Sequence, residues 1–266
     1  MTHSTHTKLE YKDLAGGGCV ATLTLNRPDQ ANAFSAAMMD EITAHCASLS
    51  RQTDVRVLVL TGSGKHFSAG ADLSWMQAAA KLSFDENIKE SERLRSMFEG
   101  LAGLTIPKVA AIRGAVYGGA VGLVACCDFA VASDTAKFCL SEVKLGLLPA
   151  VIAPYLLRKM KPGQLRRLAL TGKVFSGAEA LDCGLAEVVS SDLDSALRTE
   201  INALLAGGPE AQKAINNLFD TLRAKNNPQG DDTVRAISKA RAGAEGQAGL
   251  GSFFTKSTAP WIRTIS

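Results

Sequence analysis

The spacing of hydrophobic and polar positions changes several times along the chain, and each change predicts a boundary between elements. Residues 19–25 and 55–60 are short, largely apolar runs rich in β-branched side chains, which is typical of buried strands. Between them, Ser35 precedes apolar residues spaced three or four apart, as on one face of a helix. That face consists of Met39, Ile42, Cys46 and Leu49. The pattern predicts a strand, a helix and a strand in this order.

A second, longer helix is predicted after residue 82. Ser83 and Glu86 stand three apart, the spacing of a capping box, in which each side chain accepts a hydrogen bond from the other residue's backbone N–H. Charged residues occupy the other faces of this helix, so we expect its apolar stripe to face the core. The stripe consists of Phe84, Ile88, Leu94, Phe98 and Leu101.

The segment after Pro107 combines apolar runs with closely spaced glycines. Residues 109–113 are predicted to form a strand, residues 120–127 a buried helix, and residues 128–132 and 137–140 two more strands. A turn between the first strand and the helix is rich in glycine, with Gly114, Gly118 and Gly119. Further on, Ser176 and Glu179 form another capping box, which opens a short helix that ends at Gly184.

From Asp192 onward the pattern is helical. Strands that alternate with helices, followed by a tail without strands, indicate the α/β class with a helical appendage. We therefore expect a core over residues 1–191 and a helical oligomerisation region over residues 192–266. The predicted helix breaks are Gly207, Gly208, Pro209, Pro228 and Gly230. The apolar residues expected to hold copies of the chain together are Ile201, Leu204, Leu205, Ile215, Leu218 and Phe219.

Composition excludes several classes of protein. The chain has 266 residues, of which 46% are hydrophobic and 21% charged, so it is neither disordered, collagen-like nor a coiled coil. The longest stretch without charge, residues 114–127, is too short to span a bilayer. The first twelve residues lack the apolar run of a signal peptide. We expect a soluble cytoplasmic protein that does not bind membranes.

Charge and cysteine content narrow the possible partners. The net charge is +3, and the 29 basic and 26 acidic residues are scattered along the chain. The densest basic group comprises Arg158, Lys159, Lys161, Arg166 and Arg167. We interpret it as the solvated surface of a helix pair rather than a nucleic-acid contact. The six cysteines show no C-x-x-C spacing, so neither a structural zinc site nor a disulfide framework is expected.

Common catalytic motifs are not matched. Residues 62–65 read Gly-Ser-Gly-Lys, but position 59 is valine and position 66 histidine, which breaks the phosphate-loop pattern. No G-x-G-x-x-G stands between a predicted strand and helix, and the four histidines form no H-E-x-x-H. No G-x-S-x-G supports a nucleophilic serine. We expect neither a metal nor a separate cofactor.

Two turns and one carboxylate remain as candidate chemistry. Residues 66–73 follow a predicted strand and residues 117–120 open the buried helix, so both leave free backbone N–H groups. Two such donors that converge form an oxyanion hole, although glycines in tight turns are equally explained by backbone geometry. Glu142 lies in a largely apolar stretch, where desolvation would raise its pKa. The alternative is a glutamate in a surface turn.

Several short motifs together resemble the crotonase superfamily, the enoyl-CoA hydratase/isomerase family. They occur in the family's order and spacing over about residues 8–262, which makes the set more specific than any single motif. The matching segments are Asn26-Arg27-Pro28, residues 67–73, residues 107–114, Tyr117-Gly118-Gly119-Ala120, Cys127-Asp128, Thr171-Gly172, Ala178-Glu179-Ala180 and Gly184-Leu185.

This resemblance implies a fold and a ligand. The fold is a spiral of ββα units whose C-terminal helices pack chains into trimers, often as dimers of trimers. The ligand is an acyl-CoA thioester, so coenzyme A is part of the substrate. The backbone N–H groups of Ala71 and Gly119 hold the thioester oxygen as an enolate develops, and Glu142 matches a catalytic glutamate. Family hydratases commonly carry another glutamate at the position that is Gly122 here.

The same resemblance suggests a substrate class and a wider site. Residues 70–76, 121–128 and 138–143 are similar to hydratases of methylglutaconyl-CoA and isohexenylglutaconyl-CoA, in leucine or terpene catabolism. A single-glutamate isomerase remains the alternative, and a non-catalytic CoA-binding or RNA-binding relative is more remote. Trp75 and Met76 either line the acyl pocket or belong to the helix core, and Lys256 either contacts a CoA phosphate or is solvated. The predicted substrate-binding residues are Ser68, Ala69, Asp72, Leu73, Trp75, Met76, Gly118 and Lys256.

Overall fold

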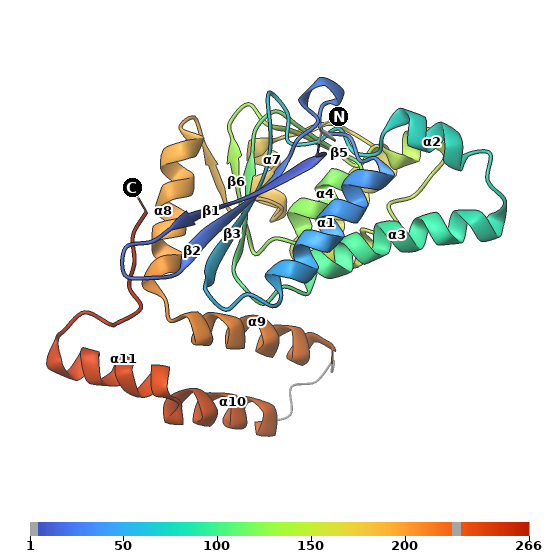
Figure 1. Cartoon of the computed structure of the whole chain (residues 1–266). Helices are drawn as coiled ribbons and strands as arrows, with labels where there is room; N and C mark the ends of the chain where they lie inside the picture. The colour runs from blue at the N-terminus through green and yellow to red at the C-terminus, as the bar shows by residue number, and fades with distance from the viewer. Residues whose placement is uncertain (1–4, 225–229, 266) are drawn as a thin grey trace.

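A mixed β-sheet runs through the middle of the molecule (Figure 1). The computed structural model describes residues 5–224 and 230–265. In this part of the chain six strands pair in the order β1-β2-β3-β4-β6-β9. β1 is antiparallel to β2, and the other neighbours are parallel. The strands are β1 (Thr7–Asp13), β2 (Cys19–Leu25), β3 (Val55–Gly62), β4 (Lys108–Ile112), β6 (Phe129–Ser133) and β9 (Val188–Ser190).

A smaller sheet lies beside the first one. It consists of β5 (Ala115–Tyr117), β7 (Lys137–Cys139) and β8 (Phe175–Ser176), with β7 in the middle. An isolated parallel bridge from Ser68 to Val116 attaches the loop after β3 to this sheet. The small sheet therefore brings together the two glycine-containing turns that the sequence singled out.

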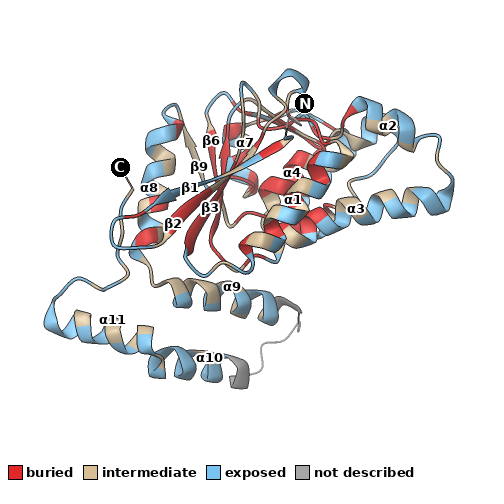
Figure 2. Ribbon diagram, in the orientation of Figure 1, coloured by how far each residue is buried: buried red, intermediate tan, exposed pale blue. Residues whose placement is uncertain are grey.

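Helices cover both faces of the large sheet, and alternate strand residues separate two cores because successive side chains point to opposite faces. Leu58 and Leu60 of β3 join the main cluster, which also contains apolar residues of α1 (Ala36–Leu49), α3 (Phe84–Ala102) and α4 (Gly119–Ala125). Val57 and Val59 face the other way, against α8 (Leu193–Ala206). Figure 2 shows the buried residues concentrated around the strands.

The remaining helices surround the small sheet or extend away from the core. One group of short helices lies in the connections between the strands, whereas the last three helices form an arm that projects from the sheet (Figures 1 and 2). The first group comprises α2 (Leu73–Ala79), α5 (Ala153–Lys159), α6 (Pro162–Thr171) and α7 (Gly177–Cys183), with the 3-10 turns η1 (Pro28–Gln30) and η2 (Glu142–Leu145). The arm comprises α9 (Pro209–Ala224), α10 (Gly230–Ala242) and α11 (Ala244–Thr255).

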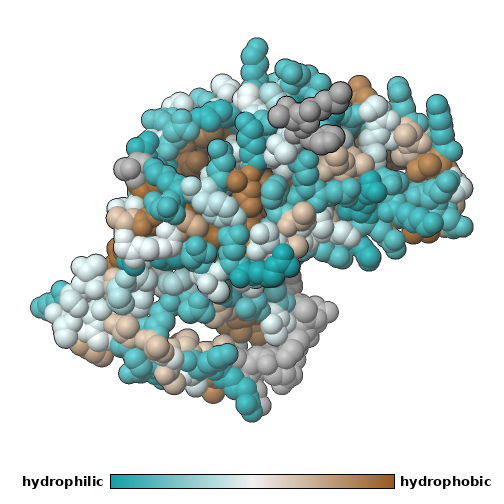
Figure 3. Space-filling model, viewed as in Figure 1, coloured by the Kyte–Doolittle hydropathy of each residue, from teal (hydrophilic) through white to brown (hydrophobic). Residues whose placement is uncertain are grey.

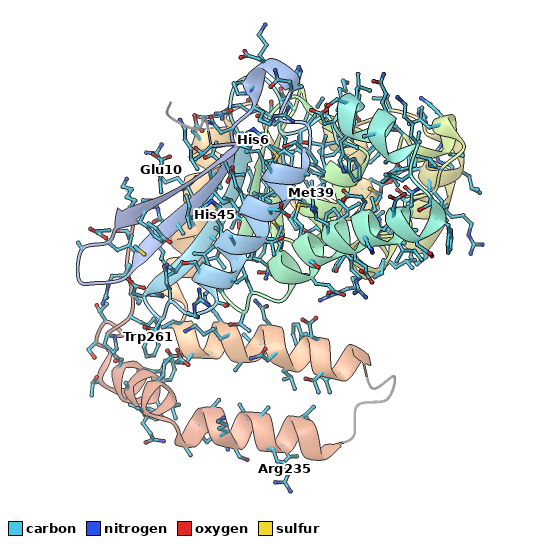
Figure 4. All side chains as sticks on the ribbon, turned by 45° about the vertical axis from the view of Figure 1, so that its right-hand side comes forward. His6, Glu10, Met39, His45, Arg235 and Trp261 are labelled. Atoms are coloured by element: carbon cyan, nitrogen blue, oxygen red, sulfur yellow. The ribbon has the colours of Figure 1, made fainter. Side chains whose placement is uncertain are left out.

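The segment after α11 returns to the core. Trp261 lies where the arm meets the core (Figure 4), and its indole N–H donates to the Ala206 carbonyl. Arg56, which is 7% exposed, reaches from β3 to the carbonyls of Trp261 and Gly207 at 2.9 Å each. These contacts fix the base of the arm.

Local sequence signals gave the correct element starts in several places. Ser35 caps α1 by accepting from the Met38 N–H. Ser83 with Glu86 opens α3, and Ser176 with Glu179 opens α7, both as complete capping boxes. These predictions are confirmed. They could be made from the sequence because each cap depends on residues only three apart in the chain.

The predicted apolar stripe of α3 is wrong in its first half. Phe98 and Leu101 are fully buried, but Phe84 is 78% and Ile88 43% exposed. The first turns of α3 extend beyond α1 and the sheet (Figure 1), which leaves these two side chains exposed. Leu94, between the two halves, is partly buried against the main core.

The predicted self-association set also needs correction. Ile201 and Leu205 of α8 are 4% and 0% exposed, because they cover the second face of the large sheet. Ile215 and Phe219 of α9 are exposed, as expected. The boundary placed at residue 191 thus precedes a helix that packs on the sheet.

Most of the basic group is paired with acidic residues. Lys159 lies 3.0 Å from Glu187, and Arg158 forms an ion pair with Asp220. Lys161 pairs with Asp182. Among residues 5–224 and 230–265, no helix has both the length and the apolar content to cross a membrane.

Candidate active site

The turn after β3 is held by main-chain hydrogen bonds to the small sheet. The Phe67 N–H donates to the Arg113 carbonyl at 2.8 Å, and the Tyr117 N–H donates to the Ser68 carbonyl at 3.0 Å. The Ser68 side chain is fully buried and accepts from the Gly70 N–H at 3.1 Å. Backbone geometry, rather than exposed side chains, therefore sets the course of this turn.

Gly70 allows the two turns to approach closely. Its φ is +88°, and a Cβ at this position would stand 2.5 Å from the Tyr117 carbonyl oxygen. Only glycine permits both the backbone conformation and the contact. On the other side, the Phe34 N–H donates to the Gly70 carbonyl at 2.7 Å and the Phe34 carbonyl accepts from the Asp72 N–H at 3.0 Å. Ala71 is thus fixed between two bonded neighbours.

The second turn places the start of α4 at the same point. Gly118 has φ 53° and ψ −128°, a conformation that residues with a Cβ rarely adopt. Its N–H donates to the Cys139 carbonyl at 2.8 Å. The next residue, Gly119, is the first residue of α4, where a backbone N–H has no partner within the helix.

Two backbone donors remain unused at the junction of the turns. Among the hydrogen bonds within residues 5–224 and 230–265, none is donated by the Ala71 N–H or the Gly119 N–H. Both residues are half-buried. Unpaired donors in a partly enclosed position can bind an oxygen that gains negative charge, which is what an oxyanion hole does.

Glu142 stands opposite the second turn. It is the first residue of η2 and half-buried, and its Oε1 lies 3.7 Å from the place of a Cβ on Gly118. Its Oε2 is buried and has no hydrogen-bond partner. Burial raises the pKa of the Glu142 carboxyl above its ordinary value of 4.5. A raised pKa makes the carboxylate a stronger base, which suits it to take up a proton and return it.

Comparison with known proteins agrees with this geometry. The family model for enoyl-CoA hydratase/isomerase matches residues 16–263. The enoyl-CoA hydratase ACTT6 of Alternaria alternata is 31% identical over 248 residues, which cover 91% of this chain and 80% of the relative. The chain belongs to the enoyl-CoA hydratase/isomerase family.

Solved structures show the same crotonase fold. An enoyl-CoA hydratase from Shewanella pealeana superposes with a TM-score of 0.88 at 37% identity and covers 95% of each chain. Pseudomonas aeruginosa AtuE gives a TM-score of 0.90 at 35% identity and covers 97% of this chain and 99% of its own. The expected α/β crotonase fold is thereby confirmed.

Asp72, one of the predicted substrate-binding residues of this family member, is engaged within the protein. Its carboxylate caps α2 through the Ser74 and Trp75 N–H groups and pairs with Arg27 at 2.8 Å. The Ser74 hydroxyl, Arg27 and these N–H groups lower the pKa of Asp72 to about 2. Asp72 therefore fixes the segment that follows Ala71.

The other predicted residues of the first turn differ in exposure. Ala69 is exposed, and its N–H donates to the Ala31 carbonyl at 2.8 Å. Leu73 is 76% exposed. Trp75 packs against the main core and donates to Glu90 on α3 at 2.9 Å, while Met76 is partly buried. Trp75 thus belongs at least in part to the core.

Lys256 is not brought to this site within one chain. It ends α11 with φ 55° and is exposed, in the arm that projects from the sheet (Figure 1). Its contact with a CoA phosphate stays a prediction.

His6 and His45 serve the packing of β1 on α1, whereas His66 accepts from the Ala115 N–H at 3.1 Å. His45 Nε2 lies 3.1 Å from the Thr7 hydroxyl, and His6 Nδ1 lies 2.8 Å from the Ser35 hydroxyl. Burial lowers the pKa of His45, so it is neutral at pH 7. Figure 4 places His6 and His45 beside β1 and α1.

Two residues of the site were missed by sequence reasoning. Phe34 supplies both main-chain bonds around Ala71, and its ring lies 3.1 Å from the place of a Cβ on Gly119. Asn32, fully buried with φ 54°, donates to the carbonyls of Ser63 and His66 at 2.8 Å each. Asparagine is common in the left-handed region, which is the one local signal that could have indicated Asn32.

Proposed function

We propose that this chain is an enoyl-CoA hydratase, which adds water across the 2,3-double bond of an acyl-CoA thioester or removes it. The observation that carries the proposal is the buried, unpartnered Oε2 of Glu142, a residue that lies close to Gly118, together with the free N–H groups of Ala71 and Gly119. Hydration needs an oxygen-binding site for the enolate and one group that moves protons. Both are present on adjoining elements.

The steps follow from these positions. The thioester oxygen accepts hydrogen bonds from the Ala71 and Gly119 N–H groups, which draws electrons from C3 of the acyl chain. The oxygen of a water molecule forms a bond to C3 while its proton passes to the Glu142 carboxylate. The double-bond electrons move to the thioester oxygen as an enolate. Glu142 then returns a proton to C2, and the enolate collapses to the 3-hydroxyacyl thioester.

We further propose a branched or glutaconyl-type acyl group as the substrate class. The support is the resemblance of residues 70–76, 121–128 and 138–143 to hydratases of such substrates. The first of these segments contains Ala71, and the third contains Glu142. The reaction would then serve leucine, isoprenoid or fatty-acid catabolism.

A double-bond isomerase is the second candidate function. It is favoured by Gly122, which leaves Glu142 without the second glutamate common in family hydratases. In that reaction Glu142 removes a proton from C2 of a 3-enoyl thioester, and the C2–H electrons pass into a dienolate. The double bond then moves to C2–C3 as the proton returns to C4. The enolate is held by the same two N–H groups.

Turnover of a panel of CoA esters, followed by mass spectrometry, separates these reactions. The panel includes straight-chain, branched and glutaconyl-type 2-enoyl and 3-enoyl esters. We expect the product of a 2-enoyl ester to gain the mass of one water. An unchanged mass with a displaced double bond would establish the isomerase instead, and no turnover of any ester would contradict both.

The arm is proposed to join copies of the chain into a trimer or a dimer of trimers. Several large apolar side chains of the arm are exposed, and Figure 3 shows apolar surface on it. They include Ile215, Phe219, Val234, Ile237, Leu250, Phe253 and Phe254. Light scattering at micromolar concentration should give three or six times the chain mass, and a monomer would contradict the proposal.

A further inference from the structure

Gly122 lies one turn after Gly119 on the same face of α4. The two residues are three apart within the helix, and the Phe98 ring lies within 4 Å of the place of a Cβ on each. Just before the helix, the place of a Cβ on Gly118 lies 3.7 Å from Glu142 Oε1. This face of α4 therefore begins at the free Gly119 N–H, and Gly122 follows one turn further in.

The side chain of Ile152 fills the space at Gly122. A Cβ on Gly122 would stand 2.2 Å from Ile152 Cγ2, 2.7 Å from Ile152 Cβ and 3.0 Å from Phe98 Cε1. Real Cβ atoms are never this close to carbon, so even alanine requires Ile152 to move. A glutamate cannot occupy this position in the present packing.

Ile152 has little freedom to move away. It is 3% exposed, belongs to the main core and directly precedes α5. Its branch at Cβ restricts χ1, so few other rotamers are open to it. The Ile152 side chain has no hydrogen-bond donor or acceptor and can therefore hold no water.

We propose that Ile152 is a specificity-determining residue, which sets the ratio of hydration to double-bond migration at this site. The inference rests on the proposed function. Migration in a 3-enoyl ester needs only Glu142, which takes a proton from C2 and returns it to C4. Hydration needs in addition a water molecule oriented toward C3, and Ile152 fills the neighbouring space with a methyl-bearing side chain. Closing that space restrains hydration more than migration.

The test compares two isoleucine substitutions of equal burial. Ile152→Ala opens the space beside Gly122, while Ile201→Ala removes the same atoms from the second core, where Ile201 is 4% exposed. Both the hydrated and the migrated products of one 3-enoyl and one 2-enoyl ester are quantified at equal conversion. We expect Ile152→Ala to raise the hydration-to-migration ratio by about tenfold, the scale on which one or two methylene groups act in a pocket. Ile201→Ala should leave the ratio as in the wild type.

A double variant sharpens the result. Gly122→Glu alone meets Ile152 and should fold poorly, whereas Gly122→Glu with Ile152→Ala has room for the second carboxylate. We expect the double variant to exceed Ile152→Ala in hydration ratio. Should Ile152→Ala fail to fold, Ile152→Val removes one methyl group and should shift the ratio in the same direction.

The outcomes are distinct. An unchanged ratio in Ile152→Ala or Ile152→Val, with a wild type that converts the esters, overturns the role of Ile152 and leaves the proposed function intact. An equal shift in Ile201→Ala also overturns it, because the effect would then reflect general loosening of the core. A wild type that converts no ester overturns the proposed function and this inference together.

Discussion

The two turns and Glu142 make up the candidate site, but they are held in place by different means. Neighbours of the free donors are fixed by main-chain hydrogen bonds, as where the Gly118 N–H donates to Cys139 and the Asp72 N–H to Phe34. The side chain of Glu142 has one buried oxygen without any partner. Its position follows from burial and packing.

This difference determines how each side can fail. A main-chain donor is lost when a side chain is added where only glycine fits, because the backbone then has to move. An acid or base is lost when its titrating group is removed, while its surroundings stay the same. Substitutions on the two sides should therefore have different signatures in binding, turnover and stability.

Glu142→Gln should have the largest effect on turnover. Glutamine keeps the volume and the neutral shape but cannot take a proton from water or return it to C2. We expect kcat to fall by about a hundredfold or more, with thioester binding retained. Steady-state kinetics and calorimetric binding of a CoA ester measure the two quantities. A wild-type rate would show that Glu142 is not the acid/base.

The same substitution should not destabilise the protein at neutral pH. Because the folded-state pKa of Glu142 lies above its ordinary 4.5, the unfolded state releases the proton first. Stability contributed by this group therefore falls as pH rises from 4.5 through the raised pKa. Glu142→Gln removes that loss, so its midpoint of thermal unfolding at pH 7 should equal or exceed the wild-type value.

Gly119→Val should have the next largest effect on turnover. Its effect on stability should be opposite to that of Glu142→Gln. Its Cβ would lie 3.1 Å from the Phe34 ring, and the added methyl groups would tilt the start of α4 and its N–H. Loss of one oxyanion donor costs on the order of a hundredfold in turnover. We expect lower stability as well.

The matched control is Gly163→Val, since nothing lies within 4 Å of a Cβ on Gly163 in α6. It should retain wild-type turnover. A folded Gly119→Val with normal kcat would exclude Gly119 from the oxyanion hole.

The backbone side of the site was more predictable than its surroundings. The glycines of both turns and the capping pairs are local signals, and the structure places them as expected. β1, β5, β8 and β9 were missed because they are short or alternate with polar residues, and their pairing depends on strands far away in the chain. Which side of the sheet α8 covers is likewise not encoded locally.

The side chains of the site, Glu142 and the residues packed near it, could be predicted only in part. The apolar neighbourhood of Glu142 in the sequence indicated a raised pKa, and the structure agrees. Sequence could show that position 122 is glycine, but not that Ile152 occupies the space beside it. A contact across thirty residues depends on how α4 and α5 pack, which periodicity does not determine.

The pH profile of kcat/KM should distinguish the main-chain donors from the carboxyl group of Glu142 without any substitution. Main-chain N–H groups do not titrate, so the acidic limb of kcat/KM reports the carboxyl group alone. Hydration requires the carboxylate form of Glu142, and burial raises its pKa above 4.5. Activity should therefore fall by about tenfold per pH unit below that raised pKa. The limb should be absent from the residual activity of Glu142→Gln, and a limb that persists there would assign it to another group.

Asp72 gives the smallest effect, because it supports the first turn from outside. Asparagine caps a helix as well as aspartate, so Asp72→Asn should keep α2 but lose the ion pair with Arg27. Asp72→Ala loses the cap too and should cost about 1 kcal/mol of stability.

The pKa of Asp72 is lowered from 3.8 to about 2, so its ionised form stabilises the fold above pH 3.8 and this contribution is lost as pH falls toward 2. Denaturation curves should therefore show wild type and Asp72→Asn converging near pH 2 and separating at pH 7. Turnover should fall only a few-fold in Asp72→Asn, since it carries no reacting group. A loss as large as that of Glu142→Gln would mean that the carboxylate of Asp72 acts on the substrate itself.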